Sequence, residues 1–205
     1  MTTETLPFKE SKKTAIFPFA ALCLAVIVSY ALLKNEIVNR PPLEHLDTSQ
    51  RPASPMEGKK APSFTLKNLN GATVQLKDHL GKILFINIWA TWCEPCREEM
   101  PAMEKLYNTL KGKDFEMLAI SIDKDGEKSV RPYVKELGLT FPVLLDPKNR
   151  VSKKYKTTGV PETFIVDRGG TIVYHQLGPE NWASPEMIET FKVMMFGQKN
   201  DAGAS

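Results

Sequence analysis

The sequence predicts an α/β fold in which helices flank a mixed central sheet, with an N-terminal hairpin and one transmembrane helix ahead of it. Between residues 59 and 196, short apolar runs alternate with helical patterns, which is typical of a layered α/β domain. Asn70-Gly71 and Arg168-Gly169-Gly170 are turn sequences between such runs, and they predict hairpins that add antiparallel strands. An uncharged run covers residues 15–33 and predicts the membrane helix.

The N-terminal part predicts a single-pass membrane protein. Residues 1–14 form a short basic tail, and residues 15–33 are long enough to span the bilayer as a signal-anchor. A cleaved signal peptide is the alternative, because Ser29-Tyr30-Ala31 loosely fits a cleavage site. The basic tail favours a cytoplasmic N-terminus, which would place the domain that follows on the periplasmic or extracellular side of the cell membrane.

Residues 34–58 are rich in proline and are predicted to form a linker. The α/β domain is predicted to cover residues 59–196, and residues 197–205 are predicted to form a loose tail. The net charge is +3 with both signs interspersed, so no nucleic-acid-binding surface is indicated. The three cysteines are too few for a disulfide framework.

The elements of the domain follow in order. Apolar and polar residues alternate on either side of Asn70-Gly71, over 64–66 and 74–76, and predict the N-terminal hairpin. A turn at 78–81 leads into a strand-like run over 82–92, and a helix follows to Leu110 with Gly112 closing it. The remaining predictions are strands over 115–122, 141–145, 163–167 and 171–174, and helices over 127–137, 151–155 and 185–196.

Cys93 and Cys96 enclose two residues and stand where this strand gives way to the helix. Such a pair can alternate between dithiol and disulfide, and a helix N-terminus favours the thiolate, which is the nucleophile. Pro95 suits a first helical turn, where its missing N–H costs no hydrogen bond, and Glu94 is expected to tune the reduction potential by its charge. The pattern therefore predicts redox chemistry.

A metal site, a haem attachment site and a structural disulfide fit the cysteine pair less well. A zinc site usually needs four ligands, and Cys23 and the three histidines are too scattered to complete one, so we expect no metal and no cofactor. Haem attachment needs histidine directly after the second cysteine, where Arg97 stands. A purely structural disulfide that closes so short a loop would stabilise the fold little.

Two motifs together resemble the thioredoxin superfamily. They are Trp89-Ala90-Thr91-Trp92-Cys93-Glu94-Pro95-Cys96-Arg97-Glu98-Glu99-Met100-Pro101 and Gly159-Val160-Pro161-Glu162-Thr163-Phe164-Ile165-Val166-Asp167. More narrowly, they resemble the membrane-tethered ResA/TlpA/CcmG-like thiol-disulfide oxidoreductases, which implies a thioredoxin-like fold over residues 59–196.

The resemblance implies a role for each matching residue. Cys93 would be the attacking thiol and Cys96 the resolving thiol. Pro161 would be cis and lie beside the sulfurs, and Val160 would offer its backbone to an extended client segment. Trp92 would shield the sulfurs.

Asn87 stands where thioredoxin has a buried acid, and its amide cannot take a proton. Glu99 lies three residues after Cys96, on the same helix face, and matches an acid of the ResA-like proteins. We therefore expect Glu99 to act in proton transfer, with a pKa raised by partial burial; the alternative is a solvated charge paired with Arg97 or Lys105.

The resemblance further implies a reductase that draws electrons from a membrane donor of the thiol-reductase type. Its clients would be disulfide-bearing proteins, with apocytochrome c before haem attachment as the expected one. Three alternatives remain: a general extracytoplasmic disulfide reductase or isomerase, a peroxiredoxin-like peroxidase, and a non-catalytic tethered adaptor. The peroxidase is disfavoured because Thr91 lies two residues before Cys93, whereas a T-x-x-C pattern needs three.

Overall fold

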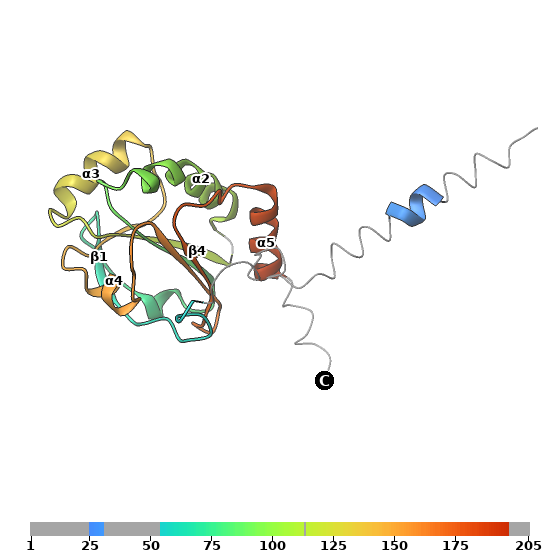
Figure 1. Cartoon of the computed structure of the whole chain (residues 1–205), viewed down its shortest axis with the longest axis horizontal. Coiled ribbons are helices and arrows are strands. Elements are labelled where there is room, and N and C mark those ends of the chain that lie inside the picture. Colours follow the sequence, from blue (N-terminus) through green and yellow to red (C-terminus); the bar gives the residue numbers. More distant parts are fainter. Residues whose placement is uncertain (1–24, 31–53, 113, 197–205) are drawn as a thin grey trace, which may run out of the picture. The chain divides into compact units, whose positions relative to one another are not determined.

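The computed structural model describes residues 25–30, 54–112 and 114–196 (Figure 1). Residues 25–30 are helical and exposed. Within the described ranges, no helix is long and apolar enough to cross a membrane. Most of the predicted span 15–33, most of the predicted linker 34–58 and the tail 197–205 lie outside the described residues.

A seven-stranded sheet forms the centre of the domain, with the strand order β2-β1-β5-β4-β3-β6-β7. β3, β4 and β5 are parallel, whereas β1 and β2 at one side and β6 and β7 at the other pair antiparallel, as the predicted mixed sheet requires. The strands are β1 (Thr65–Asn68), β2 (Thr73–Gln75), β3 (Ile83–Trp89), β4 (Phe115–Ser121), β5 (Val143–Leu145), β6 (Glu162–Val166) and β7 (Ile172–Leu177).

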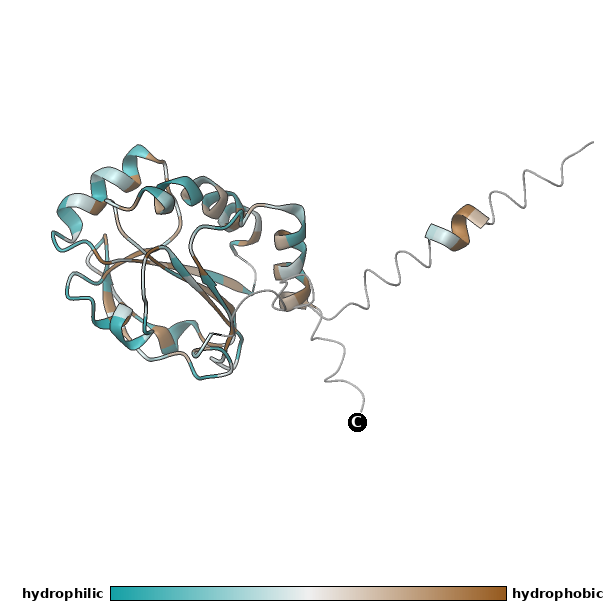
Figure 2. Ribbon diagram, in the orientation of Figure 1, coloured by the Kyte–Doolittle hydropathy of each residue, from teal (hydrophilic) through white to brown (hydrophobic). Residues whose placement is uncertain are grey.

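Helices cover both faces of this sheet (Figure 1). Side chains of α2 (Glu94–Leu110), α3 (Glu127–Glu136) and α5 (Pro185–Phe196) join one core cluster. Side chains of α4 (Arg150–Lys154) and of the 3-10 helix η1 (Leu76–His79) join the other. The apolar residues of the sheet accordingly lie inside the domain (Figure 2).

β3 is the central strand, and all seven of its residues are buried. Phe85 and Trp89 belong to the first cluster, and Leu84, Ile86 and Ile88 to the second, which follows the two-residue period of a strand. Burial on both faces explains why this strand is a continuous apolar run rather than an alternating one.

The topology brings three segments to one edge of the sheet. β3 and β4 are parallel, so their carboxyl ends at Trp89 and Ser121 lie side by side. β6 runs antiparallel to β3, with Glu162 opposite Ile88, so the amino end of β6 reaches the same edge. The segment that precedes Glu162 and the segment that follows Trp89 must therefore meet there.

The N-terminal hairpin forms as predicted, with Leu66 opposite Val74. Gly71 has a φ of 79°, which glycine adopts without strain, and the side chain of Asn68 accepts hydrogen bonds from the backbone N–H groups of Asn70 and Ala72. Two residues therefore stabilise this turn: Gly71, which adopts a positive φ, and Asn68, whose side chain accepts hydrogen bonds from the turn.

Several strand boundaries differ from the prediction; β7, for example, extends to Leu177 rather than ending at residue 174. β3 ends at Trp89 rather than continuing to residue 92, because the chain turns there and the N–H of Cys93 bonds to the carbonyl of Ala90. β5 begins at Val143 rather than residue 141, since Pro142 has no N–H to add to the ladder.

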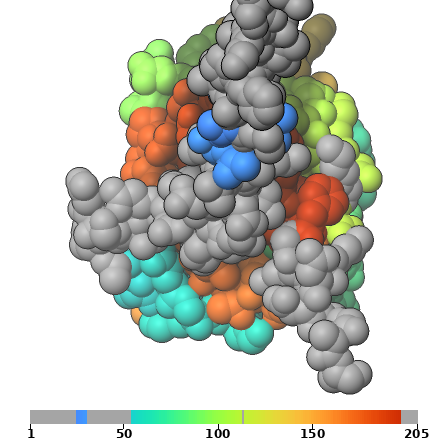
Figure 3. All heavy atoms as spheres, turned by 90° about the vertical axis from the view of Figure 1, so that its right-hand side faces the viewer, coloured from blue at the N-terminus to red at the C-terminus, as the bar shows by residue number. Residues whose placement is uncertain are grey.

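Packing also begins before the expected start at residue 59. Met56 is buried, and the N–H of Gly58 donates to the carbonyl of Ile172. Lys60 then forms a β-bridge with Thr171, and Figure 3 shows cyan residues from the start of the domain beside orange residues from its later part. Residues 54–58 of the expected linker therefore pack on the β6–β7 hairpin.

Candidate active site

Cys93 is the N-cap of α2, and Cys96 lies in the first turn of that helix. The two sulfurs form a disulfide, and the N–H of Cys96 donates to the sulfur of Cys93 over 3.2 Å. Cys93 is 5% exposed and Cys96 is fully buried, so Cys93 is the more accessible of the two. Glu94 and Pro95 are exposed beside them, with Pro95 in the first turn as predicted.

The segment before β6 meets the cysteines. The sulfur of Cys93 lies 3.4 Å from the carbonyl oxygen of Val160, and the Val160–Pro161 peptide bond is cis, as expected from the resemblance. A disulfide sulfur carries no hydrogen, so this contact becomes a hydrogen bond only when Cys93 is a thiol. Val160 is half-buried, whereas Pro161 is buried.

Glu99 is 3% exposed, although it lies on a helix otherwise rich in solvated charges. Its Oε1 accepts a hydrogen bond from Asn87 Nδ2 over 2.9 Å, and its Oε2 accepts one from Trp182 Nε1 over 3.1 Å. Burial raises the pKa of Glu99 to about 7, and the hydrogen bonds from Trp182 and Asn87 oppose that shift. The residue can therefore hold or release a proton near neutral pH.

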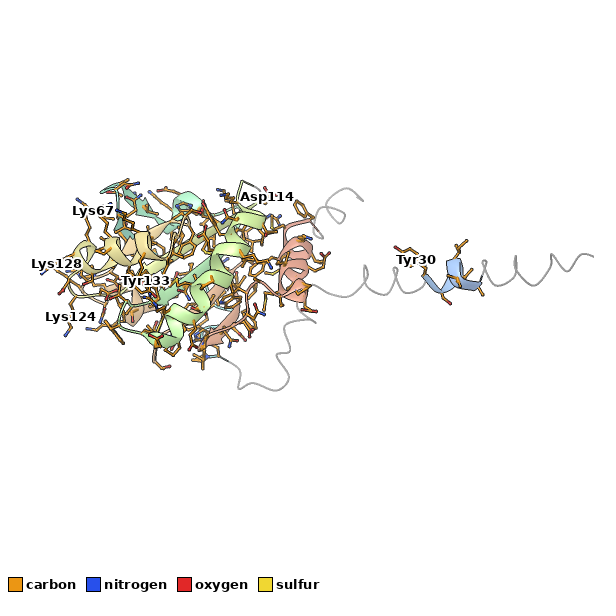
Figure 4. The ribbon with its side chains drawn as sticks, turned by 90° about the horizontal axis from the view of Figure 1, so that it is seen from above. Tyr30, Lys67, Asp114, Lys124, Lys128 and Tyr133 are labelled. Atoms are coloured by element: carbon orange, nitrogen blue, oxygen red, sulfur yellow. A yellow bond between two sulfur atoms is a disulfide. The ribbon has the colours of Figure 1, made fainter. Side chains whose placement is uncertain are left out.

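The alternative in which Glu99 is a solvated charge is wrong. Arg97 pairs with Glu136 of α3 and lies over the ring of Tyr133, with 5.2 Å from its guanidinium carbon to the ring centroid. Tyr133 projects from α3 towards α2 (Figure 4). Arg97 thus ties the two helices together.

Asn87 connects Glu99 to the strand that carries the cis-proline segment. Its Nδ2 donates both to Glu99 and to Thr163 Oγ1, each over 2.9 Å, in the buried centre of the sheet. The amide that stands in place of the acid of thioredoxin is thus a hydrogen-bond donor to the acid on α2. The sequence indicated that Asn87 replaces the buried acid of thioredoxin, but it did not indicate the hydrogen bond from Asn87 to Glu99.

Trp182 is a site residue that the sequence did not indicate. Its indole is fully buried, packs edge-on against Phe85 with 4.8 Å between ring centroids, and donates its N–H to Glu99. The N–H of Glu180, from the same loop, approaches the same carboxylate oxygen at 3.4 Å. The sequence shows a single tryptophan between β7 and α5, but the residues next to it in the sequence do not indicate a contact with Glu99.

Trp92 directly precedes Cys93 and lies at the surface. It is 68% exposed, the largest fraction among the large apolar side chains that the structure describes. Asp123 holds Thr91, the residue before Trp92. Asp123 Oδ1 accepts a hydrogen bond from Thr91 Oγ1 over 2.6 Å, and Asp123 Oδ2 accepts one from the N–H of Thr91 over 3.0 Å. A cavity of about 400 Å³ adjoins this turn, lined by Trp92, Asp123 and Lys124 among others. Trp92 therefore offers an exposed apolar surface directly before Cys93.

The described residues hold no group of three or more His, Cys, Asp and Glu side chains placed to bind a metal ion. What they bring together is a disulfide at a helix N-terminus, a backbone carbonyl beside its outer sulfur, and a buried acid with a pKa of about 7. These groups match thiol-disulfide exchange, in which a thiolate attacks a disulfide sulfur and protons move to and from the thiols.

Comparisons with known proteins agree with this chemistry. A model of the AhpC/TSA family matches residues 57–175, more than half of the chain. The thiol-disulfide oxidoreductase ResA of Bacillus thuringiensis subsp. konkukian is 37% identical over 134 residues, which cover 65% of this chain and 75% of that protein. The thioredoxin-like protein YneN of Bacillus subtilis is 40% identical over 126 residues, which cover 60% of this chain and 73% of that protein.

A solved structure shows the same fold. The thiol:disulfide interchange protein of the thioredoxin family from Chlorobium tepidum TLS has a TM-score of 0.59 at 27% identity, over 71% of this chain and 99% of that one. The segment matched by the family model contains both cysteines and the cis-proline segment. The chain therefore belongs to the AhpC/TSA family, as a ResA-like thiol-disulfide oxidoreductase whose redox pair is Cys93 and Cys96.

Proposed function

We propose that the protein is a membrane-tethered reductase that acts outside the cytoplasm and reduces the disulfide of apocytochrome c before haem attachment. The observation that carries the direction of the reaction is the environment of Cys93. Its sulfur receives the N–H of Cys96 at a helix N-terminus, but it is buried and faces the carbonyl oxygen of Val160.

These influences on the Cys93 thiol oppose one another. The helix N-terminus and the N–H group favour the thiolate, whereas burial and a carbonyl oxygen disfavour it. A strongly stabilised thiolate makes a disulfide oxidant, so a moderately stabilised one suits a protein that gives electrons away. The proposed reductase direction rests on these influences offsetting one another.

The reaction can be written with atoms and electrons balanced. The thiolate of Cys93 attacks one sulfur of the client disulfide, a mixed disulfide forms, and the released client thiolate takes up a proton. Cys96 then gives up its proton and attacks the Cys93 sulfur, which releases the second client thiolate. The client disulfide is reduced by two electrons and the Cys93–Cys96 pair is oxidised.

Glu99 is the proposed proton carrier for Cys96. It lies one helical turn after Cys96, and a pKa of about 7 allows it to exchange protons at neutral pH. Trp92 and the backbone of Val160 would receive the client on the two sides of Cys93, and Glu94 and Pro95 would tune the reduction potential. A membrane protein of the thiol-reductase type would return electrons to the pair.

The choice of client follows from the need for an extended, disulfide-bearing segment at Val160. A C-x-x-C-H segment of an unfolded apocytochrome c meets that need. The predicted anchor 15–33 would keep the domain near membrane-bound assembly partners and raise their effective concentration.

Deleting the gene and measuring covalently bound c-type haem tests the client. The proposal predicts a loss of c-type haem that an added thiol reductant restores, and that wild-type protein but not the Cys93→Ala variant complements. Normal haem levels without added reductant would show that the client is another protein.

A further inference from the structure

Glu162 is buried directly after the cis-proline, although a glutamate at a strand start is usually solvated. Its Oε1 accepts three hydrogen bonds from the loop just before it: from the N–H of Thr158 over 2.6 Å, from Thr158 Oγ1 over 2.7 Å, and from the N–H of Gly159 over 2.9 Å. These donors immediately precede Val160. The carboxylate thus holds the loop that leads into the client-docking position.

The other oxygen of Glu162 is held by a histidine. Glu162 Oε2 lies 3.0 Å from Nε2 of His175, which is buried in β7 and stacked on Phe164 with 4.1 Å between ring centroids. Burial alone would raise the pKa of Glu162, but the hydrogen bonds from His175, Thr158 and Gly159 outweigh it, so the pKa lies below the ordinary value. The acceptor therefore stays ionised.

His175 is in turn fixed by the segment that enters the domain. Its Nδ1 lies 2.5 Å from Ser54 Oγ, and its backbone N–H donates to Glu57 Oε1 over 2.8 Å. Contacts thus run from residues 54–57 through His175 and Glu162 to the loop beside Cys93. The chemistry described above uses none of these groups.

We propose that Glu162 and His175 are a positioning pair that holds the Thr158–Gly159 loop, and with it the backbone of Val160, in place for an extended client segment. Neither side chain needs to touch the client or the reacting sulfurs. The inference rests on the proposed docking at Val160 and does not depend on which protein is the client.

A comparison of two substrates tests this role. A short synthetic peptide with an internal disulfide needs the docking position, whereas 5,5′-dithiobis(2-nitrobenzoate) needs only an accessible thiolate. The test uses single turnovers of the full-length reduced protein, in which KM is the half-saturating peptide concentration and kcat is the limiting rate. Glu162→Ala should raise KM for the peptide about tenfold, because three loop hydrogen bonds are lost. Its kcat for the peptide and its rate with the small disulfide should stay within about twofold of wild type.

Three further variants make the test specific. Thr158 is exposed, so Thr158→Ala removes one of the three hydrogen bonds with little risk to folding, and we expect about a threefold rise in KM for the peptide. Glu162→Gln keeps a carbonyl acceptor and should restore near wild-type KM. The double variant T158A/E162A should match E162A, because both act through one loop.

A second His–Glu pair is the matched control. His79 Nδ1 lies 3.5 Å from Glu116 Oε2, and the hydrogen bonds to Glu162 that hold the Thr158–Gly159 loop involve neither residue. His79→Gln should leave both substrates unaffected.

The outcomes separate the two proposals. Unchanged peptide KM in folded E162A and T158A would overturn the positioning role, as would equal loss with both substrates. Failure of the wild-type protein to reduce the peptide would instead contradict the proposed docking and reductase function.

Discussion

At the scale of single residues, the two cysteines differ although only Glu94 and Pro95 separate them. Cys93 is the N-cap and retains 5% exposure, whereas Cys96 is fully buried within the helix. In the proposed mechanism, an incoming disulfide would therefore meet the outer sulfur first, and the inner sulfur would attack it afterwards. The roles implied by the family resemblance thus have a geometric basis in this chain.

Trapping of clients tests this assignment. Cys96→Ala should accumulate mixed disulfides between Cys93 and client proteins, because the resolving step is lost. Cys93→Ala should trap none, because its remaining sulfur is inaccessible. Non-reducing electrophoresis followed by mass spectrometry of the trapped species gives the comparison. Equal trapping by the two variants would contradict the assignment.

Glu99 should make the stability of the oxidised protein depend on pH. Its pKa is about 7 in the folded protein against 4.5 for an ordinary glutamate, so between these values the folded state binds more protons than the unfolded state. The free energy of unfolding therefore falls as pH rises from about 4.5 to about 7, by up to about 3 kcal/mol.

Glu99→Gln removes this dependence. Relative to wild type, the free energy of unfolding of E99Q should be higher at pH 8 than at pH 4. Chemical denaturation of both proteins at both pH values would measure this. The same variant should slow exchange, because Asn87 cannot replace the carboxyl as a proton carrier. A constant difference in unfolding free energy would mean that the pKa of Glu99 is the same in the folded and the unfolded state.

At the scale of elements, the turn between β3 and α2 is held by a residue that follows the neighbouring strand β4. Asp123, which follows β4, accepts hydrogen bonds from the N–H and the hydroxyl of Thr91 and from Ser121 Oγ. Because β3 and β4 are parallel, their carboxyl ends bring this acceptor to the turn that carries Trp92 and Cys93. The position of the helix N-terminus therefore depends on β4 as well as on β3.

Asp123→Ala should lower the free energy of unfolding by about 2 kcal/mol, since it leaves buried donors without their acceptor. Asp125 lies in the same loop and is exposed, so Asp125→Ala is a matched control and should change stability by less than about 0.5 kcal/mol. Urea unfolding of the oxidised proteins measures both. Equal effects of the two substitutions would show that Asp123 does not fix the turn.

The elements that the sequence predicted well are those encoded locally. β3 is a continuous apolar run, the first hairpin is specified by Asn70-Gly71, and α5 begins and ends at residues 185 and 196 as predicted. The error at the end of β3 arose where a local pattern continued past a tertiary constraint. The apolar run continued to Trp92, but the hydrogen bonds of Thr91 and Cys93 turn the chain earlier.

At the scale of the whole molecule, the contacts that define the site were not predictable from one sequence. Trp182 and Glu99 are 83 positions apart, and His175 and Ser54 are 121 positions apart. The sequence around Trp182 and around His175 does not indicate which residue each of them contacts. The motif around Cys93 identified the reacting groups, whereas the residues that set their environment became visible only in the fold.

The predicted anchor leads to a topology experiment. If residues 15–33 span the membrane with the N-terminus in the cytoplasm, a reporter fused after Ser205 that functions only when exported should be active. The same reporter fused to a chain lacking residues 15–33 should be inactive. A soluble mature protein that begins near Leu32 would show instead that the segment is a cleaved signal peptide.

The most direct test of the central claim is a count of thiols in a single turnover. The reduced full-length protein is mixed with a disulfide-bonded C-x-x-C-H peptide, quenched in acid, and both partners are analysed by mass spectrometry after alkylation. A two-thiol reductase should give two peptide thiols for each Cys93–Cys96 disulfide formed, with Cys23 still reduced. An intact peptide disulfide, or oxidation of the pair by peroxide in preference to the peptide, would contradict the account.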